Sequence, residues 1–416
     1  MGKVYFEASM IYLRLVRCML STYMDVKQTM QTDDLVRASN VITWNRWFLT
    51  ILGLWPLKVN QYLFIFFTIY MIIYCIMGMG HLIKNFSQLE RVVANLTDNV
   101  FFTLLLGKII ICRRSCKIMA KFLKAIENDF LTETYSSIQE KMAFLYYNHM
   151  TMIFMKVSIS LSAFAAILYY FRIFFNNWRA MISGNFSYEL PYPVYPFFEI
   201  KDMRTYLCIC IYLMIALLLI ICGYAGTDAF VLGMALHICG QFAALSCKID
   251  NLLKDRKNYH RHVTNIVSRH QHLIMLAEIL ENNFNMIFLQ QSLGTVFLLC
   301  LTLYHTIANS EYGGETNIIA VILYFLYICC VLCTIFAYCY IGECLITESS
   351  GVRDAFYNSN WYNNTPSDTK LLTICINRSE KPLMLTAGKF YTLSLNTFTN
   401  IVKTSMAYLS ILRNFV

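Results

Sequence analysis

Residues 388–416 read GKFYTLSLNTFTNIVKTSMAYLSILRNFV. This stretch contains no proline and is long enough to cross a membrane, because about 20 helical residues cover the roughly 30 Å hydrocarbon layer. Many of its side chains are nevertheless too polar to face lipid, namely Thr392, Ser394, Asn396, Thr397, Thr399, Asn400, Lys403, Thr404 and Ser405. We therefore expect a transmembrane helix that lines water or a partner interface.

One stripe of this helix changes from polar to apolar along its length. In a channel, polar side chains line the path of the ions, and an apolar ring at its end closes the path by dewetting. The pattern is typical of a pore-lining helix, although it also suits packing against a neighbouring subunit. At helical spacing the stripe contains Thr397, Asn400 or Ile401, Thr404, Tyr408, Ile411 and Phe415.

The composition of the whole chain indicates a polytopic membrane protein. Hydrophobic residues make up 57% of the 416 residues and charged residues only 14%, whereas soluble domains are about 25% charged. Several apolar runs are long enough to span a bilayer. We predict an all-α fold with seven transmembrane helices, at residues 59–83, 95–112, 142–175, 205–240, 282–310, 316–342 and 388–416.

The connections between these spans differ in charge on the two sides of the membrane. Lys and Arg number 23 on the side of the N-terminus and five on the other side, and loops rich in these residues stay in the cytoplasm. We therefore expect a cytoplasmic N-terminus and an extracellular C-terminus. Residues 1–58 then form a cytoplasmic segment, and residues 343–387 form a cytoplasmic anchor helix and turn. Residues 59–342 hold the first six spans, an outer pocket and a cytoplasmic helical foot.

This orientation places the connection of residues 176–202 outside the cell. It contains the sequon Asn185-Phe186-Ser187, which predicts glycosylation at Asn185. The run of prolines and aromatic residues that follows, 190–198, does not suit a regular helix. We expect it to form a lid over the outer ends of the spans.

Several short motifs occur together in one order and spacing. On them the chain resembles the insect odorant receptor family, specifically its ligand-tuning subunits. The resemblance covers the whole chain and is most specific towards the C-terminus. The motifs are Gly53-Leu54-Trp55-Pro56, Leu190-Pro191-Tyr192-Pro193, His270-Gln271, Gly342-Glu343, Ala355-Phe356-Tyr357, Trp361-Tyr362, Lys381-Pro382, Ala387-Gly388-Lys389-Phe390 and the segment 394–413.

The resemblance implies an odorant-gated, non-selective cation channel in the plasma membrane of sensory neuron dendrites. In the family, a tuning subunit binds a volatile apolar odorant and assembles with a shared co-receptor into a hetero-tetramer in membrane lipid. Each subunit gives its last helix to one pore. The connection between the fourth and fifth spans lacks the long insertion of the co-receptor, which favours a tuning subunit. We expect no nucleic acid partner, no cofactor and no metal.

The family's odorant lies in the outer half of the bundle, enclosed by the second, third, fourth and sixth spans. Burial of apolar surface contributes about 25 cal/mol per Å² there, so the shape of the pocket is the main discriminator between ligands. Tyr324 and Tyr327 match an aromatic pair that the family uses, although such residues also suit an ordinary core. The implied ligand-binding residues are Phe101, Phe102, Ala163, Ala166, Ile167, Tyr170, Tyr206, Cys210, Leu213, Tyr324 and Tyr327.

Matching the terminal segments implies which residues form the pore. Ile411 and Phe415 take the place of the family's outer constriction, although Phe415 is bulkier than the usual aliphatic residue. Lys403 would repel cations inside the pore, so we expect it to point sideways. The implied pore and gate residues are Asn400, Thr404, Tyr408, Ile411 and Phe415.

Three other classes of protein are alternatives. The sister gustatory receptors share the inverted architecture but end in a Thr-Tyr step and a Gln-Phe pair, whereas this chain has Thr397-Phe398 and Asn414-Phe415. A G-protein-coupled receptor would have an extracellular N-terminus and an Asn-Pro-x-x-Tyr motif in the seventh span. A transporter would show a repeated half or a pair of Gly/Pro-broken helices.

No pattern of residues favours an enzyme, because a nucleophile elbow, a phosphate loop and a zinc-binding HExxH motif are all missing from the sequence. Asp98 and Asp228 are carboxylates within or beside expected spans, where a functional role and a pairing role are both open. Four histidines lack Cys or carboxylate partners at ligand spacing, namely His260, His262, His270 and His272.

Overall fold

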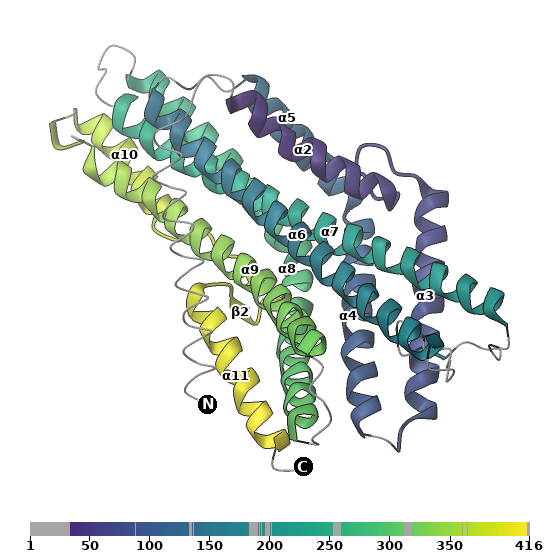
Figure 1. Ribbon diagram of the computed structural model, residues 1–416. Coiled ribbons are helices and arrows are strands. Elements are labelled where there is room, and N and C mark those ends of the chain that lie inside the picture. The colour runs from purple at the N-terminus through teal and green to yellow at the C-terminus, as the bar shows by residue number, and fades with distance from the viewer. Residues whose placement is uncertain are drawn as a thin grey trace.

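Nearly all of the described chain is helical, as Figure 1 shows. The computed structural model describes residues 34–87, 89–132, 135, 137–182, 190, 192, 194–195, 200, 202–252, 259–311, 318–359, 361–363 and 365–413. Its elements are α2 (Asp34–Ile51), α3 (Gln61–Lys84), α4 (Leu89–Arg114), α5 (Cys116–Thr132), α6 (Ile138–Ile182), α7 (Met203–Leu252), α8 (Tyr259–Glu311), α9 (Ile318–Asn358), η1 (Trp361–Asn363), α10 (Pro366–Ser379), β1 (Thr386–Ala387), β2 (Tyr391–Thr392) and α11 (Leu395–Arg413).

Six of these helices are long and apolar enough to cross a membrane, namely α3, α4, α6, α7, α8 and α9. Helix α3 illustrates why: it carries no charged residue before Lys84, and its exposed side chains include Phe66, Ile69 and Ile73. Such a surface is stable against acyl chains and not against water. These helices confirm the expected all-α, polytopic membrane fold.

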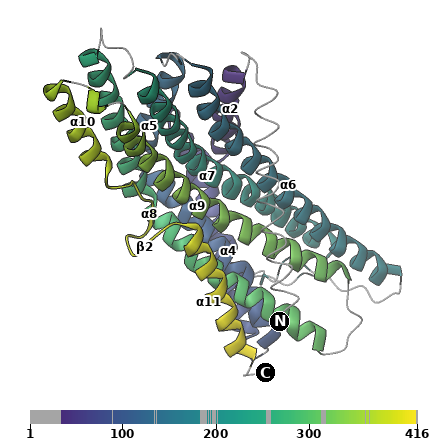
Figure 2. The ribbon, with the colours of Figure 1, turned by 90° about the vertical axis from the view of Figure 1, so that its left-hand side faces the viewer.

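Helices α7 and α8 are much longer than a bilayer is thick. They contain 50 and 53 residues, which correspond to about 75 and 80 Å at 1.5 Å per residue. In both Figure 1 and Figure 2, α2, α5 and α10 lie towards the end of the bundle opposite the C-terminal end of α11. We call this end of the bundle the foot.

The last helix begins later than the sequence pattern predicted. Residues 388–394 are not helical, because Thr386–Ala387 and Tyr391–Thr392 form an antiparallel hairpin. At its turn, Gly388 and Lys389 have positive φ angles of 58° and 65°, a left-handed conformation that a helix does not contain. Helix α11 therefore covers Leu395–Arg413 only.

Candidate functional site

Three helices bring aromatic rings together inside the bundle. The ring of Phe101 (α4) stacks on that of Tyr224 (α7), with centroids 4.8 Å apart and planes at 21°. It also lies 6.0 Å from the ring of Tyr327 (α9) and 6.2 Å from that of Phe102. We call Phe101, Phe102, Tyr224 and Tyr327 the aromatic cluster. Rings at these separations attract one another through their quadrupoles as well as by burial.

The connection before α7 covers one side of this cluster. Tyr192 is buried, and its ring lies 6.2 Å from the rings of both Phe102 and Tyr74. Tyr74 of α3 in turn packs 4.0 Å from Phe102. Val194 is also buried, and the Tyr195 amide donates to the carbonyl of Met77 over 3.0 Å. The described part of the Pro/aromatic run therefore packs on α3 and α4.

A buried ion pair lies directly against the cluster. Lys108 of α4 is fully buried, and its Nζ lies 2.7 Å from Oδ1 of Asp228 on α7. The same Nζ lies 3.7 Å from the centre of the Tyr224 ring, a cation–π arrangement. Tyr338 of α9 donates its hydroxyl to Asp228 Oδ1 over 2.6 Å. The carboxylate of Asp228 is thus paired with groups on two other helices.

The structure brings only some of the predicted ligand residues together. Phe101, Phe102 and Tyr327 meet in the cluster, whereas Ile167 is 67% exposed and points away from the bundle. Tyr206 is buried, and its hydroxyl accepts from Nδ2 of Asn177 over 2.5 Å. Leu213 is fully buried, while the other predicted residues are partly buried, namely Ala163, Ala166, Tyr170, Cys210 and Tyr324.

Tyr224, Lys108 and Tyr338 were missed by reasoning from the sequence. A signal for two of them was present: Lys108 lies seven residues after Phe101, and Asp228 lies four after Tyr224. Both spacings put the two residues on one helical face. A lysine and an aspartate on facing apolar helices therefore indicate a pair.

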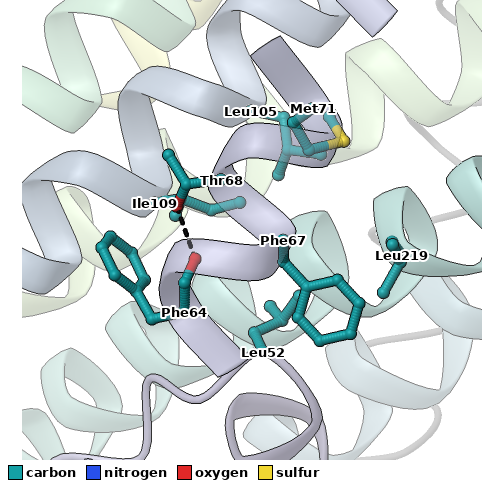
Figure 3. A pocket seen from close by; sticks show the side chains of 8 residues that line it. All are labelled: Leu52, Phe64, Phe67, Thr68, Met71, Leu105, Ile109 and Leu219. Atoms are coloured by element: carbon teal, nitrogen blue, oxygen red, sulfur yellow. Dashed lines mark hydrogen bonds between the residues drawn. The ribbon is translucent and has the colours of Figure 1, made fainter. Parts of the chain in front are cut away.

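A separate pocket opens between the α2–α3 connection, α3, α4 and α7 (Figure 3). Its cavity volume is about 10 Å³, room for roughly one water molecule, and none of the predicted ligand residues lines it. The hydroxyl of Thr68 already donates to the Phe64 carbonyl over 2.7 Å, so the pocket offers apolar contact. Its lining residues are Leu52, Phe64, Phe67, Thr68, Met71, Leu105, Ile109 and Leu219.

Helix α11 packs one face on its own chain. Ile401, Ser405 and Leu409 are buried, and Leu409 belongs to a cluster that includes Cys300 and Leu301 of α8. Figures 1 and 2 show α11 along the outside of the bundle, beside α8 and α9. Within the part of the chain that the structure describes, its other face is exposed.

The predicted pore stripe lies on this uncovered face. Asn400 and Thr404 are exposed, and Tyr408 and Ile411 are 53% and 54% exposed. Because Ile401 is buried, the stripe passes through Asn400 and not through Ile401. Lys403 is exposed as well. Two predicted sites, Phe415 and Asn185, lie outside the described residues.

The start of α11 is tied to the long helices through the motif residues. Gly342 of α9 packs against Leu393, and a Cβ at this glycine would overlap the Leu393 carbonyl oxygen. Next to it, Glu343 Oε2 accepts the backbone N–H of Leu395 over 3.1 Å, which caps the helix and suits its N-terminal dipole. Gly342 and Glu343 therefore hold the N-terminal end of α11 against α9.

The hairpin before α11 is fixed to α8 in the same way. Glu281 Oε2 accepts the backbone N–H of Thr386 over 2.8 Å, and Oε1 accepts the Thr386 hydroxyl. The Gly388 amide donates to the carbonyl of Asn285 over 3.0 Å. Hydrogen bonds of Glu281, Asn285 and Glu343 therefore join the start of α11 to both α8 and α9.

The foot contains its own buried charges. Asp129 of α5 accepts from Arg269 Nη1 of α8 over 2.8 Å, and His237 Nε2 of α7 lies 3.2 Å from its Oδ2. Burial acts to raise the pKa of Asp129, but the hydrogen bonds with His237 and Arg269 outweigh it and lower the pKa to about 2. This carboxylate therefore stays ionised and joins three helices.

Comparisons with known proteins agree with this geometry. The profile of the family described as "7tm Odorant receptor" matches residues 88–406. The chain is 25% identical to "Odorant receptor 22c" of Drosophila melanogaster over 207 residues, 47% of this chain and 50% of that protein. It is 27% identical to the "Odorant receptor coreceptor" of Anopheles gambiae over 146 residues, 35% of this chain and 30% of that protein. The chain thus spans about half the length, or less, of these curated relatives.

A solved structure has the same fold. The insect olfactory receptor OR5 from Machilis hrabei, in complex with eugenol, matches with a TM-score of 0.77 at 17% sequence identity. The match covers 92% of this chain and 100% of that chain.

Proposed function

This chain belongs to the insect odorant receptor family, and we propose that it is a ligand-tuning subunit of an odorant-gated cation channel. The family is one of receptors, which agrees with the expectation that the chain is not an enzyme. The chain is a multi-pass membrane protein. Its plasma-membrane location with a cytoplasmic N-terminus belongs to the proposal.

The single observation that carries the channel proposal is the uncovered face of α11. A transmembrane helix with Asn400 and Thr404 exposed is unstable against acyl chains, because each unsatisfied polar group in hydrocarbon costs several kcal/mol. Such a face requires water or protein beside it. A pore shared with partner subunits supplies both, with Tyr408 and Ile411 at the apolar end.

A tuning role is supported by the short connection between α7 and α8. Helix α7 ends at Leu252 and α8 begins at Tyr259, so there is no room for the long insertion that marks the co-receptor. The relatives include both odorant receptors and co-receptors, which supports assembly with a co-receptor. We propose a hetero-tetramer in which the aromatic cluster binds an apolar volatile.

Co-expression in a cell line without other odorant receptors tests this function. The chain is expressed with an insect co-receptor, the co-receptor alone is the control, and currents are recorded against a broad panel of volatiles. Odorant-evoked cation currents that require both subunits are expected. Normal surface expression, intact currents to a direct co-receptor agonist and no response to any volatile would contradict the proposal.

A further inference from the structure

The polar groups around the aromatic cluster are almost all occupied within the protein. The Tyr224 hydroxyl donates to Oε1 of Gln291 over 2.9 Å. The Tyr338 hydroxyl donates to Asp228 Oδ1, and the ammonium group of Lys108 is paired with the same carboxylate. Each of these groups therefore already has a partner in the protein before any ligand enters.

Tyr327 is the exception at the cluster. Its hydroxyl oxygen is buried and has no hydrogen-bond partner among the described residues. Its ring packs 6.0 Å from Phe101 and among apolar side chains that include Leu298 and Val331. A buried hydroxyl without a partner is unfavourable, and its O–H donor and its lone pairs both stay available to an incoming group.

We propose that the ligand of this cluster is an apolar volatile that carries one uncharged oxygen function, which hydrogen-bonds to the hydroxyl of Tyr327. Carbonyl, hydroxyl and ester oxygens all suit it. A negatively charged group is excluded because the site is apolar and the ammonium group of Lys108 is already paired with Asp228. This assignment rests on the proposed function and names the ligand class for the same site.

Matched pairs of volatiles test the assignment. Benzaldehyde is compared with styrene, and acetophenone with α-methylstyrene, because a methylene group replaces the carbonyl oxygen at nearly constant shape. Straight-chain methyl ketones and the corresponding alkenes extend the panel. The oxygenated member of each active pair is expected to be the stronger agonist of the chain co-expressed with a co-receptor.

Two variants identify the hydroxyl responsible. Tyr327→Phe should raise the half-maximal concentration of oxygenated agonists by about three- to tenfold, the range for one neutral hydrogen bond, and leave the hydrocarbons unchanged. It removes an unpaired hydroxyl, so surface expression should not fall. Tyr224→Phe is the matched control, because its hydroxyl is bonded to Gln291, and it should affect both members of a pair alike.

The outcomes of these experiments distinguish a failure of the role of Tyr327 from a failure of the proposed receptor function. Equal potency of the two members of each pair, or an unchanged response of Tyr327→Phe to ketones and aldehydes, would overturn the role of Tyr327 and leave the receptor function standing. No response to any volatile, with direct co-receptor currents intact, would instead contradict the proposed function.

Discussion

Nζ of Lys108 and Oδ1 of Asp228 lie 2.7 Å apart in the interior of the bundle, where the two side chains are 0% and 7% exposed. The pair joins α4 to α7, and Tyr338 extends it to α9. Because Lys108 also faces the Tyr224 ring, the pair packs directly against the aromatic cluster. Removal of one partner leaves a buried charge, which is far more costly than removal of both.

Lys108→Met should therefore destabilise the protein by about 3–5 kcal/mol, the usual cost of breaking a buried pair. The double variant Lys108→Met with Asp228→Asn removes both charges and should recover most of this loss. Thermal unfolding midpoints in detergent, combined in a double-mutant cycle, measure the coupling. If the stability lost in the double variant equals the sum of the losses in the two single variants, the Lys108–Asp228 interaction does not stabilise the protein.

The contact of Gly342 with Leu393, next to the start of α11, predicts different outcomes for two glycines of α9. Gly342→Ala should lower surface expression or change the basal current, because the new Cβ overlaps the carbonyl of Leu393. Gly351→Ala is the matched control, since its Cβ would meet Ser246 Oγ at an ordinary 3.7 Å. Helix propensity favours alanine by about 1 kcal/mol at both sites. Equal surface expression and equal basal current of the two variants would contradict a role of this contact in placing α11.

Asp129 predicts how the stability of the foot depends on pH. Its folded pKa of about 2 lies below the ordinary value of 3.8, so its contribution is complete above about pH 4 and is lost as the pH falls towards 2. The pKa difference corresponds to about 2 kcal/mol. Asp129→Asn should therefore lower the unfolding midpoint at pH 5, and the difference from wild type should shrink as the pH falls towards 2. An equal midpoint of the two proteins at pH 5 would contradict the assignment.

The cytoplasmic N-terminus that we propose from loop charge can be checked in cells. An epitope placed before Met1 should be accessible to antibody only after permeabilisation. Asn185 should carry a glycan, so Asn185→Gln should increase electrophoretic mobility to that of the enzymatically deglycosylated protein. Staining of the N-terminal epitope in intact cells would contradict the proposed cytoplasmic N-terminus.

Much of the fold was predictable because membrane helices are encoded locally. Runs such as residues 59–83 need only enough consecutive apolar side chains, and α3 spans Gln61–Lys84. The start of α11 was not predictable, because the hairpin before it depends on Asn285 and Glu281, which are distant in the sequence. Local pattern favours a continuous helix there, and long-range contacts decide otherwise.

The candidate site was predictable only in part, for the same reason. Helical spacing placed Asn400 and Thr404 on one face, and the structure leaves that face uncovered. Ile167 was expected at the ligand site, but apolar residues on a membrane helix face lipid and core alike. Neither the residue type of Ile167 nor its spacing distinguishes a lipid-facing from a core-facing position. In the structure, Ile167 is exposed.

Cysteine accessibility on α11 tests the central claim, that this helix lines a pore, most directly. Asn400→Cys and Thr404→Cys lie on the uncovered face, and Ser405→Cys, which is buried against the chain, is the matched control. Wild type sets the background, because the chain has 16 cysteines. A cationic thiol reagent applied during odorant activation should reduce the current through the first two variants and spare the third. Normal surface expression with no effect at Asn400 and Thr404, or an equal effect at Ser405, would contradict a pore-lining α11.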